Sequence, residues 1–105
     1  MSNSEFLFKG KSRNLKDSVI GRFLDELAEH ISLSDYPWLK HACNRWQEDW
    51  KTMPPGCKDI DLDAVIIDSN RRHIFEEKVR EIQESISERS IEQELNRILE
   101  LIDVK

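Results

Sequence analysis

Cysteine and histidine are the side chains in this sequence best suited to bind a transition metal. His41 and Cys43 are two residues apart, whereas Cys57, His30 and His73 are scattered along the chain. Structural zinc sites usually take their ligands from two closely spaced pairs, and the sequence holds no C-x-x-C and no second pair. Cys43 also falls in the apolar stripe of an expected helix. We therefore interpret Cys43 as a small buried residue and expect no metal and no cofactor.

Three aspartates alternate with apolar residues in the sequence D-I-D-L-D at 59–63. Alternating oxygen ligands open a calcium-binding loop, which places glycine at its sixth position and glutamate at its twelfth. Here those positions hold Ala64 and Asn70. The pattern therefore favours a capping or partner-contact role for the three carboxylates over calcium binding.

Nucleophilic catalysis requires a cysteine or serine beside a histidine and an orienting carboxylate. These residue types are present, but the sequence holds no nucleophile elbow, no glycine-rich phosphate loop and no H-E-x-x-H. The neighbouring carboxylates Glu76 and Glu77 fall on a charged helix face. We expect that the protein is not an enzyme.

The charge of the chain is unevenly distributed. Residues 1–52 hold eight basic and eight acidic side chains, whereas residues 53–105 hold eight basic and thirteen acidic ones, which accounts for the net charge of −5. Direct binding to nucleic acid requires clustered Lys and Arg, so we do not expect it. An acidic surface instead suits a basic protein partner.

The composition also bears on location. No stretch approaches the roughly 18–20 apolar residues of a membrane span, and the N-terminal residues lack an apolar signal region. A secreted disulfide scaffold usually holds more than two cysteines. We therefore expect a cytoplasmic protein with reduced thiols, with no membrane contact and an oligomeric state that the sequence leaves open.

Apolar residues recur at spacings of three and four, which predicts an all-α fold. We expect a single domain, 1–105, built as a bundle of about four helices with residues 1–13 as a short arm. Asn14, Asp68 or Ser69, and Ser90 with Gln93 are the expected helix caps. Pro54, Pro55 and Gly56 should break the chain between the second and third helices. The predicted helices are 14–32, 36–52, 70–87 and 91–103, with a short extra turn, or alternatively a strand, at 62–67.

The stretch 35–63 holds all three tryptophans of the chain. Core packing is the favoured interpretation of Trp46 and Trp50, which lie one helical turn apart. The alternative is an aromatic patch rimmed by acidic residues, because tryptophan is enriched at binding hot spots. The predicted partner-binding residues are Trp38, Trp46, Glu48, Asp49, Trp50, Asp59, Asp61 and Asp63.

The motif W-x-x-D-W, followed by P-P-G-C-x-D-I-D-L-D, resembles bacterial immunity proteins of contact-dependent growth inhibition and related systems. The resemblance covers residues 38–67. It implies a cytosolic protein that binds one cognate toxin domain, often a basic nuclease, and masks its active site or substrate surface. The alternative is a small regulatory or adaptor protein, including one of phage origin, that acts by protein–protein contact or self-association.

Overall fold

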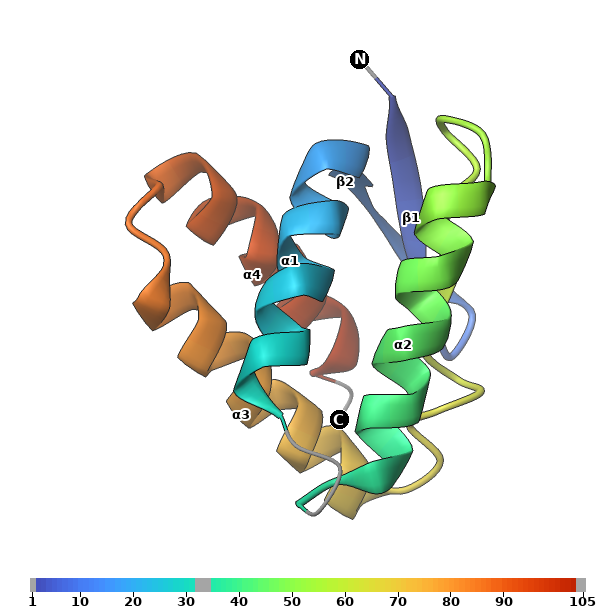
Figure 1. Ribbon diagram of the computed structural model, residues 1–105. Coiled ribbons are helices and arrows are strands. Elements are labelled where there is room, and N and C mark those ends of the chain that lie inside the picture. The colour runs from blue at the N-terminus through green and yellow to red at the C-terminus, as the bar shows by residue number, and fades with distance from the viewer. Residues whose placement is uncertain (1, 32–34, 104–105) are drawn as a thin grey trace.

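The computed structural model describes residues 2–31 and 35–103 (Figure 1). Helices and short strands both occur, so the predicted all-α fold is wrong. The elements in chain order are β1 (Asn3–Phe8), β2 (Lys11–Lys16), α1 (Asp17–His30), α2 (Pro37–Thr52), β3 (Ile60–Asp61), α3 (Ser69–Ser85) and α4 (Arg89–Ile102).

The strands form one mixed sheet in the order β2-β1-β3. β1 runs antiparallel to β2 and parallel to β3. The residues predicted as an arm are therefore β1 and the first half of β2. Alternation explains β1, since Ser4, Phe6 and Phe8 are buried on one face of the strand. Lys9 and Gly10 join the two strands with φ values of 49° and 78°, as a tight hairpin turn requires.

The predicted turn at 62–67 follows a strand that the prediction missed. β3 pairs with β1, and the Leu62 N–H extends the pairing by donating to the Leu7 carbonyl at 2.9 Å. The Leu62 carbonyl then accepts the N–H groups of Val65 and Ile66 at 3.1 and 2.7 Å, which closes one hydrogen-bonded turn.

The helices lie within three residues of their predicted bounds, and they differ by two or three residues at the N-termini of α1 and α4 and at the C-termini of α1 and α3. α1 begins at Asp17 rather than near Asn14, because residues 14–16 pair with β1. The predicted last residue of this helix, Ser32, lies outside the described residues. Asp68 caps α3 as predicted, accepting the Arg71 N–H at 2.8 Å. The capping box predicted at Ser90 is wrong, since α4 begins at Arg89 and its cap residue makes no side-chain cap bond.

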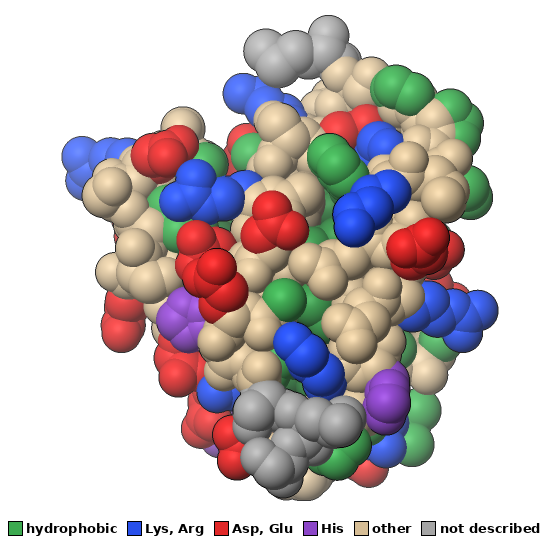
Figure 2. Space-filling view, in the orientation of Figure 1, with side chains coloured by type: hydrophobic (Ala, Val, Ile, Leu, Met, Phe, Trp, Pro, Cys, Tyr) green, Lys and Arg blue, Asp and Glu red, His purple; other side chains and the backbone are tan. Residues whose placement is uncertain are grey.

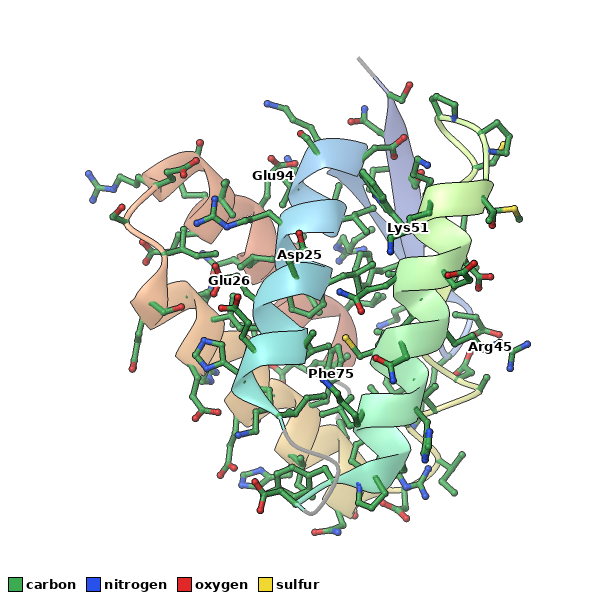
Figure 3. All side chains as sticks on the ribbon, in the orientation of Figure 1. Asp25, Glu26, Arg45, Lys51, Phe75 and Glu94 are labelled. Atoms are coloured by element: carbon green, nitrogen blue, oxygen red, sulfur yellow. The ribbon has the colours of Figure 1, made fainter. Side chains whose placement is uncertain are left out.

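The core lies between the sheet and the helices. α1 packs against α2 and α3, while α4 packs against α3 and β2 (Figure 1). A chain of edge-to-face aromatic contacts crosses this core, with ring centroids 6.0 Å apart for Phe6–Phe23, 6.2 Å for Phe23–Phe75 and 6.3 Å for Phe75–Trp46. Phe75 is seen between α1 and α2 in Figure 3. These rings join the sheet, α1, α3 and α2 into one apolar unit.

Two side chains of α4 bond to the outer edge of β2. Glu94 accepts the Lys16 N–H at 3.2 Å, and Arg97 donates to the Asn14 carbonyl at 2.7 Å. Unpaired edge groups of a strand are a template for association with another strand. α4 therefore covers part of the edge that the hairpin would otherwise present.

Candidate functional site

A groove of about 450 Å³ lies between α2 and the segment from β3 to the start of α3. It brings together five of the eight predicted partner-binding residues, which are Trp38, Trp46, Asp49, Asp59 and Asp61. Three basic side chains that the prediction did not include also line it: His41, Arg45 and Arg71. The groove is therefore of mixed charge, not simply an aromatic patch with an acidic rim.

The two groove tryptophans are held differently. Trp46 is 7% exposed and belongs to the core, as the favoured interpretation predicted. Trp38 is only half-buried, and the guanidinium carbon of Arg71 lies 4.7 Å from its ring centroid. Arg71 is fixed in turn by donating to the Val65 carbonyl at 3.1 Å. Trp38 thus presents a partly exposed aromatic surface backed by a stacked cation.

The aspartates around β3 fasten the sheet. Asp59 accepts the Glu5 N–H at 2.8 Å, and both carboxylate oxygens of Asp63 lie 3.0 Å from the Lys9 N–H. These two carboxylates continue the pairing of β1 beyond the ends of the short β3. Asp61 accepts the Asp63 N–H at 3.0 Å and shapes the following turn. Local fastening, one of the two roles considered from the sequence, is thus present at all three positions.

Trp50 lies on the other side of α2, facing α1. Its indole N–H donates to the Asp17 carbonyl at 3.0 Å, and the Lys58 ammonium lies 4.6 Å from its ring centroid. The ring covers Gly21 and, with Lys51, helps to line a second hollow of about 370 Å³ between α1 and α2. Figure 2 shows hydrophobic side chains between these helices, flanked by charged ones.

The predicted patch is therefore divided between two sides of α2. Figure 3 makes the division visible, because Lys51 projects on the side of α2 that faces α1 and Arg45 projects away from it. Glu48 is exposed, and neither it nor Asp63 is among the residues that line the groove. The helical spacing of 38, 41, 45 and 49 was the sequence signal that could have found the groove-facing row.

A buried polar network holds the loop that leads to Asp59. Asp17, 8% exposed, accepts the Ser4 hydroxyl at 2.6 Å and the Gly56 N–H at 2.9 Å. The Lys58 N–H donates to the same Ser4 oxygen at 2.9 Å, and the Lys58 ammonium bonds to the Trp50 and Met53 carbonyls at the end of α2. This network fixes one wall of the groove relative to the other.

Cys43 is fully buried in the core, where the sequence placed it. Its thiol donates to the Leu24 carbonyl at 3.4 Å. Burial raises the pKa of Cys43 to about 11, partly offset by the positive charge of Lys40. The thiol is therefore protonated at neutral pH, so it lacks the thiolate that attack or metal binding requires.

Ser85, His30 and Glu26 come together on the surface of α1 and α3. The Ser85 hydroxyl and a Glu26 oxygen lie 3.4 and 3.8 Å from the same histidine nitrogen, Nε2. A catalytic relay uses the two ring nitrogens separately, one for the nucleophile and one for the orienting carboxylate. The trio therefore lacks the geometry of such a relay. Within residues 2–31 and 35–103, no three His, Cys, Asp or Glu side chains are grouped to hold a metal ion.

The described helices also include none with the length and apolar content that crossing a membrane demands. Comparison with protein-family models, curated proteins and solved structures finds no match for this chain. A function must therefore be inferred from the groove and from the resemblance seen in the sequence.

Proposed function

We propose that this protein is a non-enzymatic inhibitor that neutralises a cognate bacterial toxin domain by covering its active site or substrate surface. The resemblance of residues 38–67 to immunity proteins suggests the class of partner. One structural observation carries the proposal: the groove beside α2 gathers Trp38 and Trp46 with the carboxylates of Asp49, Asp59 and Asp61.

Binding hot spots combine a large aromatic side chain with charged groups in a hollow that excludes water. Trp38 meets this description, because its ring is half-buried, stacked on Arg71 and already oriented before any partner arrives. An anchor that is rigid in the free protein loses less conformational entropy on binding. The net charge of −5 would also steer a basic toxin domain toward the chain.

The proposal predicts that a toxin domain is encoded immediately upstream of this chain's gene, and the direct test is co-expression of that domain with this chain in the cytoplasm. Cells that make the toxin alone should stop growing, and cells that make both proteins should survive. The purified proteins should form a complex, and Trp38→Ala should weaken it by about 30-fold, which corresponds to a hot-spot loss of about 2 kcal/mol. Failure of the parent chain to protect, or to bind, would refute the proposal.

Trp38→Ala needs a check on folding, since Trp38 packs against the core. Circular dichroism of the variant should retain the parent's helical signal. Ile67→Ala is a suitable comparison, because Ile67 is a large apolar side chain that is 67% exposed and does not line the groove. This variant should bind as tightly as the parent; an equal loss in both variants would place the interface elsewhere.

A further inference from the structure

The charges that line the groove are ordered along α2. His41, Arg45 and Asp49 follow one another at intervals of four residues, so they form a row roughly 12 Å long at 1.5 Å per residue. Arg71, stacked on Trp38, adds a second cation near the first turn of α2. The groove therefore begins with positive charge at the N-terminal end of α2.

The opposite end of the groove is acidic. Asp49 is in the last turn of α2, and Asp59 follows Lys58, whose ammonium bonds to the carbonyls of Trp50 and Met53. Asp59 and Asp61 each use one oxygen in a backbone hydrogen bond. Each carboxylate keeps its other oxygen for an additional donor. The groove is thus polarised along its length.

The fold does not account for the charges of Arg45 and Asp49 in this row. Among the described residues, the side chains of Arg45 and Asp49 form no ion pair or hydrogen bond with each other or with a third residue. An arginine followed four residues later by an aspartate is the less favourable order for a helical ion pair. A negative charge in the last turn also opposes the helix dipole. The charge of Asp49 therefore destabilises α2, as is typical of a residue whose role is to bind a partner.

We propose that the groove receives a peptide segment of mixed charge from the partner, an inference that rests on the proposed function for the source of that segment. A Lys or Arg of the segment binds at Asp49, Asp59 and Asp61. An Asp or Glu of the segment binds at Arg45 and Arg71, and Arg45 lies roughly 6 Å from Asp49 along the axis of α2. An apolar side chain next to the acidic residue covers Trp38, which lies at the same end of the groove as Arg71. The partner is thus recognised by an ordered pair of opposite charges rather than by a uniformly basic surface.

The test uses a displayed library of random 12-residue peptides, selected against the purified full-length chain. Enriched peptides should hold both a basic and an acidic residue. Asp49→Lys and Arg45→Glu should each weaken their binding at least tenfold. The matched controls are Glu48→Lys, which makes the same charge change next to Asp49, and Lys51→Glu on the other side of α2. Both controls should bind within about twofold of the parent.

Unfolding measurements separate loss of binding from loss of structure. Asp49→Lys removes a charge that opposes the helix dipole, so its melting temperature should equal or exceed the parent's. Three results would overturn the inference. The selection could enrich no sequence, it could enrich peptides that hold only basic residues, or the enriched peptides could bind Asp49→Lys and Arg45→Glu as tightly as the parent chain. If the parent chain protects cells from the toxin under any of those results, the proposed function stands and this inference falls. If the peptides behave as expected and protection fails, the proposed function falls and the groove's specificity stands.

Discussion

Trp50 packs on Gly21, so whether alanine at position 21 raises or lowers the free energy of unfolding should depend on the Trp50 side chain. A Cβ atom added at Gly21 would lie 2.8 Å from Cζ2 of Trp50 and 3.0 Å from Cε2, closer than carbon atoms pack. The indole cannot turn away freely, because its N–H donates to the Asp17 carbonyl at 3.0 Å. The space next to Gly21 is thus filled by the Trp50 side chain.

The size of the effect follows from two opposing terms. Alanine is favoured over glycine in a helix interior by about 1 kcal/mol. Overpacking costs about 1–3 kcal/mol. Gly21→Ala should therefore lower the free energy of unfolding by about 1 kcal/mol in the parent chain. With Trp50→Leu already present, the same change should raise it by about 1 kcal/mol.

Urea unfolding of the four chains, followed by circular dichroism at 222 nm, measures this double-mutant cycle. The signal comes from the helices, so losing Trp50 does not remove the probe. The expected coupling between the two positions is about 2 kcal/mol. A coupling below about 0.5 kcal/mol, with alanine stabilising in both backgrounds, would show that the indole does not restrict position 21 and refute the reasoning.

Three further predictions concern the core and the polar network. Phe75→Ala should lower the free energy of unfolding by about 3–5 kcal/mol in urea titrations, because Phe75 is fully buried; a loss below 1 kcal/mol would contradict its place in the core. Asp17→Asn should cost about 1–3 kcal/mol in the same assay, since an amide cannot accept from both the Ser4 hydroxyl and the Gly56 N–H; an unchanged midpoint would show that one bond suffices. The raised pKa of Cys43 means that the folded state holds its proton longer than the unfolded state, so stability should fall as pH rises from about 9 to about 11. Cys43→Ala should lack this part of the pH dependence, and parallel curves for both chains would refute it.

The helices were predictable because their signals are local. The stripes of α2, α3 and α4 repeat through three or four turns, and Asp68 lies only three residues before Arg71, whose backbone N–H it caps. Pro54, Pro55 and Gly56 end α2 without help from the rest of the chain. Such local signals can be recognised from a single sequence.

The sheet was missed because its pairing is largely nonlocal. β2 reads K-S-R-N-L-K and buries only Leu15, so it shows no alternation. β3 is two residues long and is recognised only by its contact with β1, 54 positions earlier. Phe6 and Phe8 do alternate with Leu7 in the sequence, but without a partner strand this alternation indicated only an extended arm.

The groove residues on α2 were predictable from local spacing, whereas the contacts of α2 with other elements were not. Trp38, Trp46 and Asp49 lie on one helix, so their common side follows from helical spacing. The sequence could not place Arg71 on Trp38, since that contact depends on where the start of α3 lies relative to α2. Nor could it tell that Trp50 turns toward α1, because its polar partner is a backbone carbonyl that any residue carries.

Because α4 covers the outer edge of β2, that edge can be closed only after α4 has been synthesised. The bonds from Glu94 to Lys16 and from Arg97 to Asn14 join residues 78 and 83 positions apart. On the ribosome the hairpin is made before the side chains that close its edge. Closing such long loops is slow compared with forming helices. A nascent chain halted before Glu94 would therefore hold an open strand edge, which is a template for aggregation.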